Sequence, residues 1–130
     1  INSALQVDFL GQVVSDSIGT RQFSGVGGQV DFMRGAAMAK DGKAKAIIAM
    51  PSVTVKKDGT MISKIVPFID EGAAVTATRH DADYIITEYG IAHLKGKTLK
   101  ERARALVEIA HPKFREGLKR QFETRFNCEY

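Results

Sequence analysis

Apolar and polar residues alternate near the start of the chain, from Leu5 to Phe9, and a second apolar run begins after Gln12. Alternation with a period of two is typical of a half-buried β-strand. Gly11 lies between the two runs and favours a tight turn. We therefore predict a pair of strands joined by a turn at residues 9–11.

The middle third of the chain is rich in strand signals. Residues 46–50 form a short apolar run that ends at Pro51, a pattern typical of a strand buried on both faces. Asp58-Gly59 separates two β-prone runs and predicts a hairpin. Residues 74–78 are rich in β-branched side chains and residues 83–88 are mostly apolar, so each predicts a further strand.

Three segments have helical spacing. Apolar residues recur every three or four positions through residues 29–40, and Asp41-Gly42 follows as a stop signal. The pair Thr98 and Glu101 forms a capping box at the start of a second helix. Pro112 stands where a third helix can begin. Strands that alternate with helices indicate an α/β domain with a mixed sheet.

Composition limits the class of protein. The chain has 130 residues, 44% hydrophobic and 26% charged, which fits one globular domain and excludes collagen-like and disordered chains. No apolar run approaches the roughly 20 residues of a membrane-spanning helix. A single cysteine, Cys128, favours a reducing, cytoplasmic compartment. The chain opens at Ile1 without an initiator Met, and we interpret it as a piece of a longer polypeptide.

The net charge of +4 is concentrated in one region. Residues 95–125 contain ten Lys or Arg against four Glu, and these charges alternate with the apolar stripe of the two C-terminal helices. Such a pattern predicts solvated helix faces. No aromatic side chains interleave with the basic ones as a stacking surface would require. We therefore expect neither nucleic acid nor a membrane as a partner.

The densest chemical signal is the glycine-rich segment 24–32. Glycines let the backbone approach a ligand closely, and free N–H groups at the start of a helix attract anions, as in a phosphate cradle or an oxyanion hole. The dinucleotide-binding pattern is not met, because Val30 stands where the third glycine belongs, and no P-loop Lys follows. On spacing alone, a structural turn explains these glycines equally well.

Glu88 ends an apolar run, so we expect it at the carboxyl edge of a sheet, where open α/β sheets bind ligands. An ordinary exposed or N-capping glutamate is the alternative. The histidines lack the spacing of metal ligands, so we predict no metal site. We assign structural or solvent-facing roles to His80, His93 and His111. We expect His93 on a short helical turn.

The strings at residues 1–13, 25–32, 59–67, 75–79, 86–92 and 109–112 occur in an order that resembles the C-terminal domain of the acetyl-CoA hydrolase/transferase family. Its members include 4-hydroxybutyrate CoA-transferase and butyryl-CoA:acetate CoA-transferase. The resemblance implies the CoA-transferase superfamily fold (NagB/RpiA-like), an open, mixed, mostly parallel sheet with flanking helices and two C-terminal helices. Residues 1–130 are then a C-terminal domain, with an N-terminal domain upstream.

The resemblance also implies an activity, the transfer of CoA from an acyl-CoA to a short-chain carboxylate such as 4-hydroxybutyrate, butyrate or acetate. A glutamate attacks the thioester to give an acyl-glutamyl anhydride, and CoA thiolate then forms a glutamyl-CoA thioester. A carboxylate is ionised at neutral pH and needs no general base, so the main demand is to stabilise the oxyanion. CoA is a substrate, no further cofactor is implied, and a homodimer is compatible with the family.

Specific residues match the family's site. The segment Gly25-Val26-Gly27-Gly28 matches the oxyanion loop, with the N–H of Gly27 or Gly28 facing the thioester oxygen and Gln29 completing the substrate-binding segment. Glu88 matches a second active-site glutamate that holds the substrate or the nucleophile. Asn2 matches an asparagine near the acyl site. Ile62-Ser63-Lys64 resembles a stretch beside bound CoA, with Lys64 as a cationic contact.

The nucleophilic glutamate of the family lies upstream of the segment that matches Ile1, and no glutamate precedes Glu71 in this chain. We therefore expect these 130 residues to be inactive alone. Two alternatives stay open. One is an acetyl-CoA hydrolase, in which water resolves the enzyme intermediate, and the other is a nucleotide- or anion-binding module without chemistry.

Overall fold

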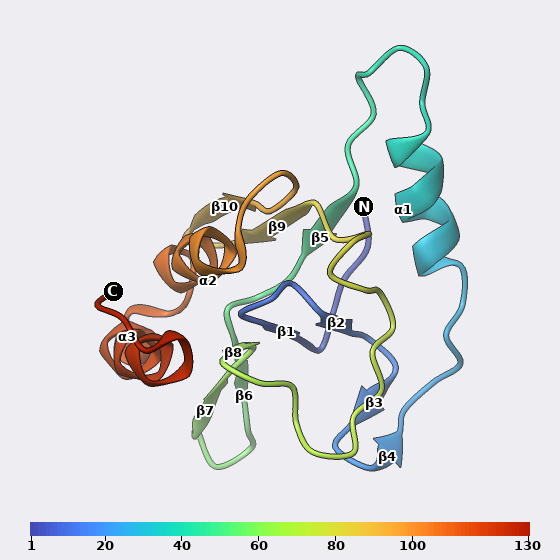
Figure 1. Cartoon of the computed structure of the whole chain (residues 1–130). Coiled ribbons are helices and arrows are strands. Elements are labelled where there is room, and N and C mark those ends of the chain that lie inside the picture. Colours follow the sequence, from blue (N-terminus) through green and yellow to red (C-terminus); the bar gives the residue numbers. More distant parts are fainter.

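The computed structural model describes residues 1–130 and contains ten short strands and three helices. In chain order they are β1 (Gln6–Asp8), β2 (Val13–Val14), β3 (Ser17–Ile18), β4 (Arg21–Gln22), α1 (Gln29–Ala37), β5 (Ile47–Ala49), β6 (Val53–Val55), β7 (Met61–Ser63), β8 (Ile65–Val66), β9 (Tyr84–Thr87), β10 (Gly90–His93), α2 (Leu99–Glu108) and α3 (Pro112–Phe126). The strands occupy the middle of the molecule, α2 and α3 lie together on one side, and α1 stands apart on the other (Figure 1). The α/β class with two C-terminal helices is confirmed.

The strands form two mixed sheets and two hairpins. In the sheet β2-β1-β8, β1 is antiparallel to β2 and parallel to β8, and in β10-β9-β5, β9 is antiparallel to β10 and parallel to β5. The hairpins are β3–β4 and β6–β7. Asn2 links the sheets, because its N–H donates to the Ile47 carbonyl (2.9 Å) and its carbonyl accepts from the Ala49 N–H (2.8 Å). The expected mixed sheet is thus two small linked sheets, in which parallel pairing makes up only part.

Both hairpins that the turn residues predict are present in the structure, as β1–β2 and β6–β7. Gly11 has φ +89° in the turn between β1 and β2, and a Cβ there would lie 2.9 Å from the Leu94 side chain, so both backbone and space require glycine. Gly59, at φ +86°, follows Asp58 in the β6–β7 turn. The apolar run after Gly59 is divided at Lys64, where the chain leaves β7 and β8 begins to pair with β1.

The C-terminal helices begin as their capping residues predict. The Thr98 hydroxyl accepts from the Glu101 N–H (3.3 Å) and the Glu101 carboxylate accepts from the Thr98 N–H (2.7 Å), which completes the capping box of α2. Pro112 opens α3, and its N-cap is His111. One face of each helix joins the core cluster of 21 buried apolar residues, through Ala103, Leu106, Val107, Leu118 and Phe122. No helix here combines the length and the apolar character that a membrane crossing requires.

Two predictions of secondary structure are wrong. Residues 74–78 form no strand, since only Ala77 bridges to Val13, and Thr76 turns its hydroxyl to the Asp16 carboxylate instead. His93 lies on β10, not on a helical turn, because the segment pairs with β9 in the register His93–Tyr84. The sequence pattern also did not predict β3–β4, whose two-residue strands are too short to show alternation.

The first helix is shorter than expected and loosely attached. It ends at Ala37, three residues before Lys40, and Met33 is its one buried side chain. Asp81 ties it to the body, because the Arg34 guanidinium donates to that carboxylate from Nε at 3.1 Å. The position of α1 therefore depends on the buried Met33 side chain and a few polar contacts.

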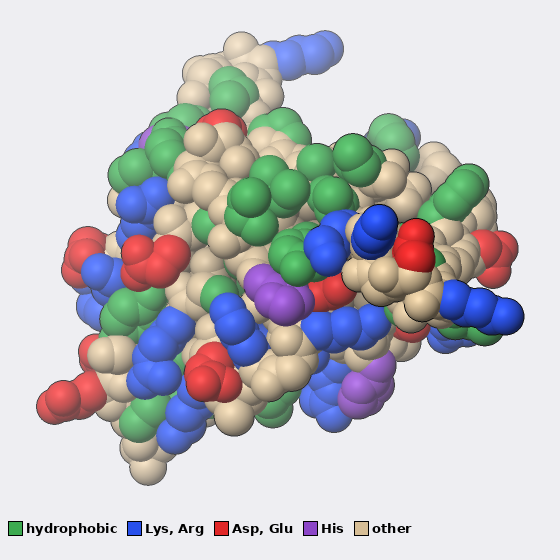
Figure 2. Space-filling view, turned by 90° about the horizontal axis from the view of Figure 1, so that it is seen from above, with side chains coloured by type: hydrophobic (Ala, Val, Ile, Leu, Met, Phe, Trp, Pro, Cys, Tyr) green, Lys and Arg blue, Asp and Glu red, His purple; other side chains and the backbone are tan.

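The expectation of wholly solvated basic helix faces is wrong at Arg102, which is only 8% exposed. Other cations of these helices lie over aromatic rings, among them Arg104 over Phe122 and Arg125 over Phe68. Seen from above, the molecule shows Lys and Arg side chains beside histidines and among apolar side chains (Figure 2). Some of the excess Lys and Arg side chains therefore contribute to packing within the fold.

Candidate functional site

The glycine segment before α1 is an exposed loop whose backbone is open to a ligand. Gly27 has φ +61°, and a Cβ on Gly25 or Gly27 would meet nothing within 4 Å. Gly28 is the N-cap of α1 and offers no side chain to the N–H groups of the first helical turn. Those N–H groups lack intrahelical partners, so they can donate to an anion. Val26 is also exposed, at 58%.

Gln29 fastens this loop to the N-terminal segment. Its Nε2 donates to the Ser3 carbonyl (2.7 Å), and its Oε1 accepts from the Ser15 hydroxyl (3.0 Å). Ser3 follows Asn2, which is paired with β5. The structure therefore brings the start of the chain, including Asn2, close to the first turn of α1.

Asp16 holds the segment that leads into the glycines. Its carboxylate accepts from the Thr76 hydroxyl (2.7 Å) and from the Gln22 amide (3.1 Å), and its carbonyl accepts from the N–H groups of Phe23 and Ser24. The pKa of Asp16 is held below its ordinary value by the Thr76 hydrogen bond, which outweighs the opposing effect of burial. The sequence pattern did not identify Asp16, because a single aspartate beside polar residues does not indicate that it organises a loop.

Glu88 directly follows β9, and the neighbouring parallel strand β5 ends at Ala49, so both strands point to the same edge. The predicted position at a carboxyl edge is confirmed. The Ser52 N–H donates to Glu88 Oε1 at 2.6 Å. Tyr89 lies next to it, edge-on to the His111 ring with centroids 5.5 Å apart.

Burial of Glu88 by its neighbours raises the pKa of this carboxyl. Hydrogen bonding from Ser52 and the proximity of His111 act in the opposite direction and prevail, so the pKa lies below its ordinary value. Glu88 is therefore a carboxylate at neutral pH. One of its oxygens is fixed by the Ser52 N–H, and its carboxylate makes no other hydrogen bond. Such a group can hold a cation or accept a hydrogen bond from a ligand.

Ser52 connects two candidate regions, although the sequence pattern did not identify it. It is fully buried, it donates its N–H to Glu88, and its carbonyl accepts from the Lys64 N–H (2.9 Å). Its hydroxyl is buried and has no partner. The one available signal was its place directly after Pro51, where an apolar strand ends.

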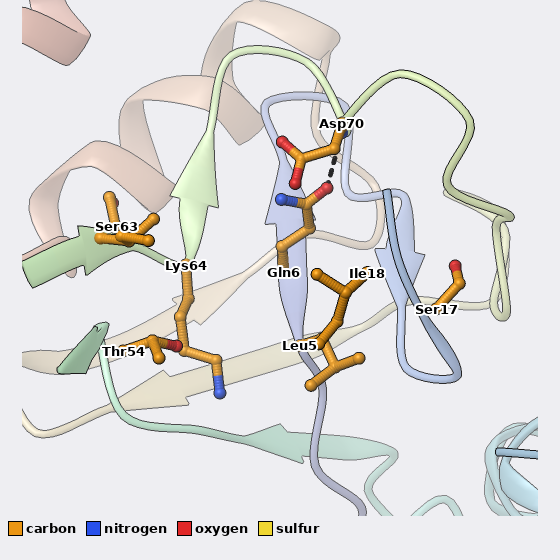
Figure 3. A pocket seen from close by; sticks show the side chains of 9 residues that line it. Leu5, Gln6, Ser17, Ile18, Thr54, Ser63, Lys64 and Asp70 are labelled. Carbon is orange, nitrogen blue, oxygen red and sulfur yellow. Dashed lines mark hydrogen bonds between the residues drawn. The ribbon is translucent and has the colours of Figure 1, made fainter. Parts of the chain in front are cut away.

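The predicted stretch Ile62-Ser63-Lys64 lines a cavity of about 150 Å³. The rest of its wall comes from β1, β3, β6 and the loop after β8, through Leu5, Gln6, Ser17, Ile18, Thr54 and Asp70. Figure 3 shows Lys64 near Thr54, and the Asp70 N–H donating to the Gln6 amide oxygen (2.7 Å) on another side of the cavity. A mixed polar and apolar wall of this kind suits part of an elongated ligand that carries an anionic group.

Lys64 supplies the positive charge of this cavity. It is half-buried, and burial lowers its pKa below the ordinary value of 10.5. It forms no ion pair with Asp70, the acidic residue that shares the cavity wall. Its ammonium group is therefore free to pair with an anion.

The candidate residues form three neighbouring groups and share no single cavity within these 130 residues. Asn2 and Gln29 belong to one group, Glu88 with Ser52 to a second, and Ile62, Ser63 and Lys64 to the third. Ser52 bridges the second and third groups. The glycine loop has no hydrogen bond to Glu88.

Comparison with known proteins identifies the family of this chain. A model of the acetyl-CoA hydrolase/transferase C-terminal domain matches residues 1–122. The chain is 61% identical over 126 residues to a 4-hydroxybutyrate coenzyme A transferase of Clostridium kluyveri, covering 97% of this chain and 28% of that protein. It is 46% identical over 118 residues to a butyryl-CoA:acetate CoA-transferase of Anaerostipes caccae, covering 91% and 26%.

A solved structure agrees with this assignment. The crystal structure of RipA from Yersinia pestis superposes with a TM-score of 0.81 at 41% identity, over 97% of this chain and 27% of that one. The chain thus spans about a quarter of the length of these relatives. The match over residues 1–122 shows that the chain belongs to the acetyl-CoA hydrolase/transferase family.

Proposed function

We propose that the protein of which these residues form part moves CoA between an acyl-CoA and a short-chain carboxylate. The relatives named above are CoA-transferases, and their names include 4-hydroxybutyrate, butyryl-CoA and acetate. In this proposal CoA is a substrate, and the reaction passes through a glutamyl-CoA thioester.

The nucleophilic glutamate in this proposal comes from outside these residues. Its carboxylate attacks the thioester carbon of the acyl-CoA, and CoA leaves as the thiolate. The thiolate then attacks the glutamyl carbonyl of the anhydride, and the free carboxylate departs. The incoming acid repeats these steps in reverse, so atoms and charge balance without a redox partner.

The role proposed for this chain is to stabilise charge and to bind CoA. The N–H groups of Gly27 or Gly28 donate to the oxygen of the thioester as negative charge develops on it. The exposed backbone at Gly27 and Gly28, which carry no side chain, supports this role. Lys64, with Ile62 and Ser63, contacts CoA along the cavity of β7 and β8, and Asn2 lies near the acyl group.

The observation that carries the proposal is the Glu88 carboxylate. It stands at the edge where β5 and β9 end, it is ionised, and the Ser52 N–H fixes one oxygen at 2.6 Å. Its other oxygen has no hydrogen-bond partner, so it can orient the substrate or the attacking glutamate. Orientation of reacting groups contributes strongly to rate, and misplacement by about 1 Å lowers it by roughly 100-fold.

Substitution of Glu88 tests this proposal in the whole protein. Glu88→Gln keeps the size of the side chain but removes the charge, and we expect kcat for acyl exchange between acetyl-CoA and butyrate to fall about 100-fold. Glu88→Asp keeps the charge on a shorter chain and should retain more activity than the amide. Steady-state kinetics with each variant measure both effects.

Glu71→Gln is the matched control, since it makes the same chemical change at an exposed side chain that forms no hydrogen bond or ion pair. It should leave kcat within twofold. Equal activity of the Glu88→Gln variant and the native protein would remove Glu88 from the mechanism.

Hydrolysis is the second candidate, because the family's own description joins hydrolases with transferases. In that reaction water takes the place of the carboxylate acceptor.

A further inference from the structure

A second hollow, with a volume of about 280 Å³, lies away from the groups described above. It is lined by Arg79, His80, Lys97, Thr98, Leu99 and Arg102. Arg79 precedes β9 and Lys97 follows β10, which pair in the register His93–Tyr84. The hollow is therefore at the opposite end of β9 from Glu88, and the proposed transfer of CoA uses none of its residues.

Arg102 is the feature that points to a ligand. It is nine-tenths buried, and its guanidinium donates to the carbonyls of Arg79 (2.6 Å), Leu10 (3.2 Å) and Lys97 (3.3 Å). These neutral carbonyls satisfy N–H groups without neutralising the charge, and no carboxylate forms an ion pair with Arg102. Nη2 makes no hydrogen bond and is not sealed in the interior. Arg102 lines the hollow, and Nη2 is the one nitrogen of its guanidinium without a hydrogen bond.

The surroundings of Arg102 are also positive. Arg79 and Lys97 add two exposed cations, and α2 begins at the hollow with the N–H groups of Leu99 and Lys100 outside the capping box. Burial and the charge of Arg79 lower the pKa of Arg102, against a smaller opposite effect of Asp83. A buried charge is normally paired, so this arrangement lacks a negative partner.

Two carboxylates lie near the hollow but form no ion pair with its cations. Glu101 accepts from the Thr98 N–H in the capping box, and Asp83 lies 2.8 Å from His93 Nε2. Neither one forms an ion pair with Arg79, Lys97 or Arg102. The positive charge of the hollow therefore remains available to a ligand.

We propose that this hollow binds a tetrahedral oxyanion, either free phosphate or the phosphoryl group of a larger molecule. Nη2 of Arg102 and the first-turn N–H groups of α2 donate to its oxygens, while Arg79 and Lys97 supply charge from the rim. The bound anion ties α2 to the loops that carry Leu10 and Arg79. This site is independent of the proposed CoA transfer.

The test measures binding of inorganic phosphate to the chain by amide chemical shifts and by thermal unfolding, against chloride at equal ionic strength. Phosphate should raise the unfolding temperature more than chloride does. It should also shift the amide signals of Leu99, Lys100 and Arg102. Arg79→Ala and Lys97→Ala should each weaken binding about 10-fold. Both leave the fold intact, because Arg102 is held by the backbone carbonyls of these residues and not by their side chains.

Lys57→Ala is the matched control, because it removes one positive charge at an exposed side chain outside the hollow. Its affinity for phosphate should stay within twofold. Adenosine monophosphate provides a second arm: tighter binding than phosphate identifies a phosphoryl group on a larger molecule, and equal binding identifies free phosphate. A response to phosphate no greater than that to chloride, or one that survives both alanine substitutions, would overturn the proposal.

Discussion

Single side chains shape the proposed oxyanion loop from outside it. Asp16 organises the approach to the glycines through its carboxylate and its carbonyl, and its main partner, Thr76, is 60 positions away in the chain. The Thr76 hydroxyl has a second role, since it accepts from the Ser15 N–H (2.9 Å). One threonine thus satisfies two polar groups beside the path to Gly25.

Thr76→Val should destabilise the fold by about 1–3 kcal/mol, because it leaves Oδ1 of Asp16 and the Ser15 N–H without their partner at nearly constant volume. Urea unfolding followed by circular dichroism measures the change. Thr76→Ser keeps the hydroxyl and should recover most of the lost stability. If valine and serine variants unfold at the same urea concentration, the hydrogen bonds contribute nothing.

The same pair predicts a dependence of stability on pH. The folded-state pKa of Asp16 lies below its ordinary value of 3.8, so its contribution is complete above that value. The contribution is lost as the pH falls through the folded-state pKa. The gap in stability between the native chain and the Thr76→Val variant should therefore narrow below about pH 4. A gap that is constant from neutral pH to strong acid would contradict this assignment.

Among the elements, α1 matters most for the proposed chemistry because the glycine loop leads into its first turn. It is held by Gln29 at its start, by buried Met33, and by the Arg34–Asp81 ion pair. Most of its remaining surface is open, with Phe32 73% exposed. The loop can therefore be altered without disturbing the core.

Gly28→Val should lower turnover of the whole protein about 100-fold, since a branched side chain obstructs the approach of the thioester oxygen to the N–H groups. Stability should change by about 1 kcal/mol or less, because the φ of Gly28 is −102° and a Cβ there lies 3.7 Å from the Phe32 ring. Kinetics and thermal unfolding of the same variant separate the two effects.

Gly35→Ala, on the same helix, is the control for Gly28→Val. A Cβ at Gly35 meets nothing within 4 Å, so activity should stay unchanged while helix propensity improves. Loss of folding in the Gly28→Val variant would favour a purely structural turn.

At the scale of the whole molecule, the candidate groups surround no common cavity in these 130 residues, and the relatives are about four times as long. We infer that the remaining walls and the nucleophile come from the rest of the polypeptide. The family's name leaves two fates for the enzyme intermediate, attack by a carboxylate or by water.

Activity assays distinguish these fates. The 130-residue chain alone should show no acyl exchange, whereas the whole protein should consume acetyl-CoA at a rate that depends on butyrate or 4-hydroxybutyrate. Release of CoA at a rate indifferent to the carboxylate would identify a hydrolase. Clear turnover by the chain alone would contradict an external nucleophile, and tight CoA binding without turnover by the whole protein would favour a binding module.

Local chemistry explains which elements the sequence could predict. The capping box at Thr98, the turn at Asp58-Gly59 and the break at Pro51 each act within a few residues, so their patterns are legible in one stretch of chain. The strand expected at residues 74–78 does not form, because the backbone of this segment bridges to the rest of the chain only between Ala77 and Val13. The β10 assignment of His93 likewise depended on pairing with β9.

The amino-acid sequence by itself determined the α/β class, the main turns and caps, the family resemblance and the edge position of Glu88. Only the tertiary structure decided what those residues contact. Ser52 reaches Glu88 across 36 positions, and Arg102 reaches the Leu10 carbonyl across 92. Apolar periodicity and turn chemistry are local properties of a chain. The pairing of buried polar groups is decided only when distant segments pack together and exclude water, and that packing brings the buried Ser52 N–H to Glu88 and surrounds Arg102 with carbonyls.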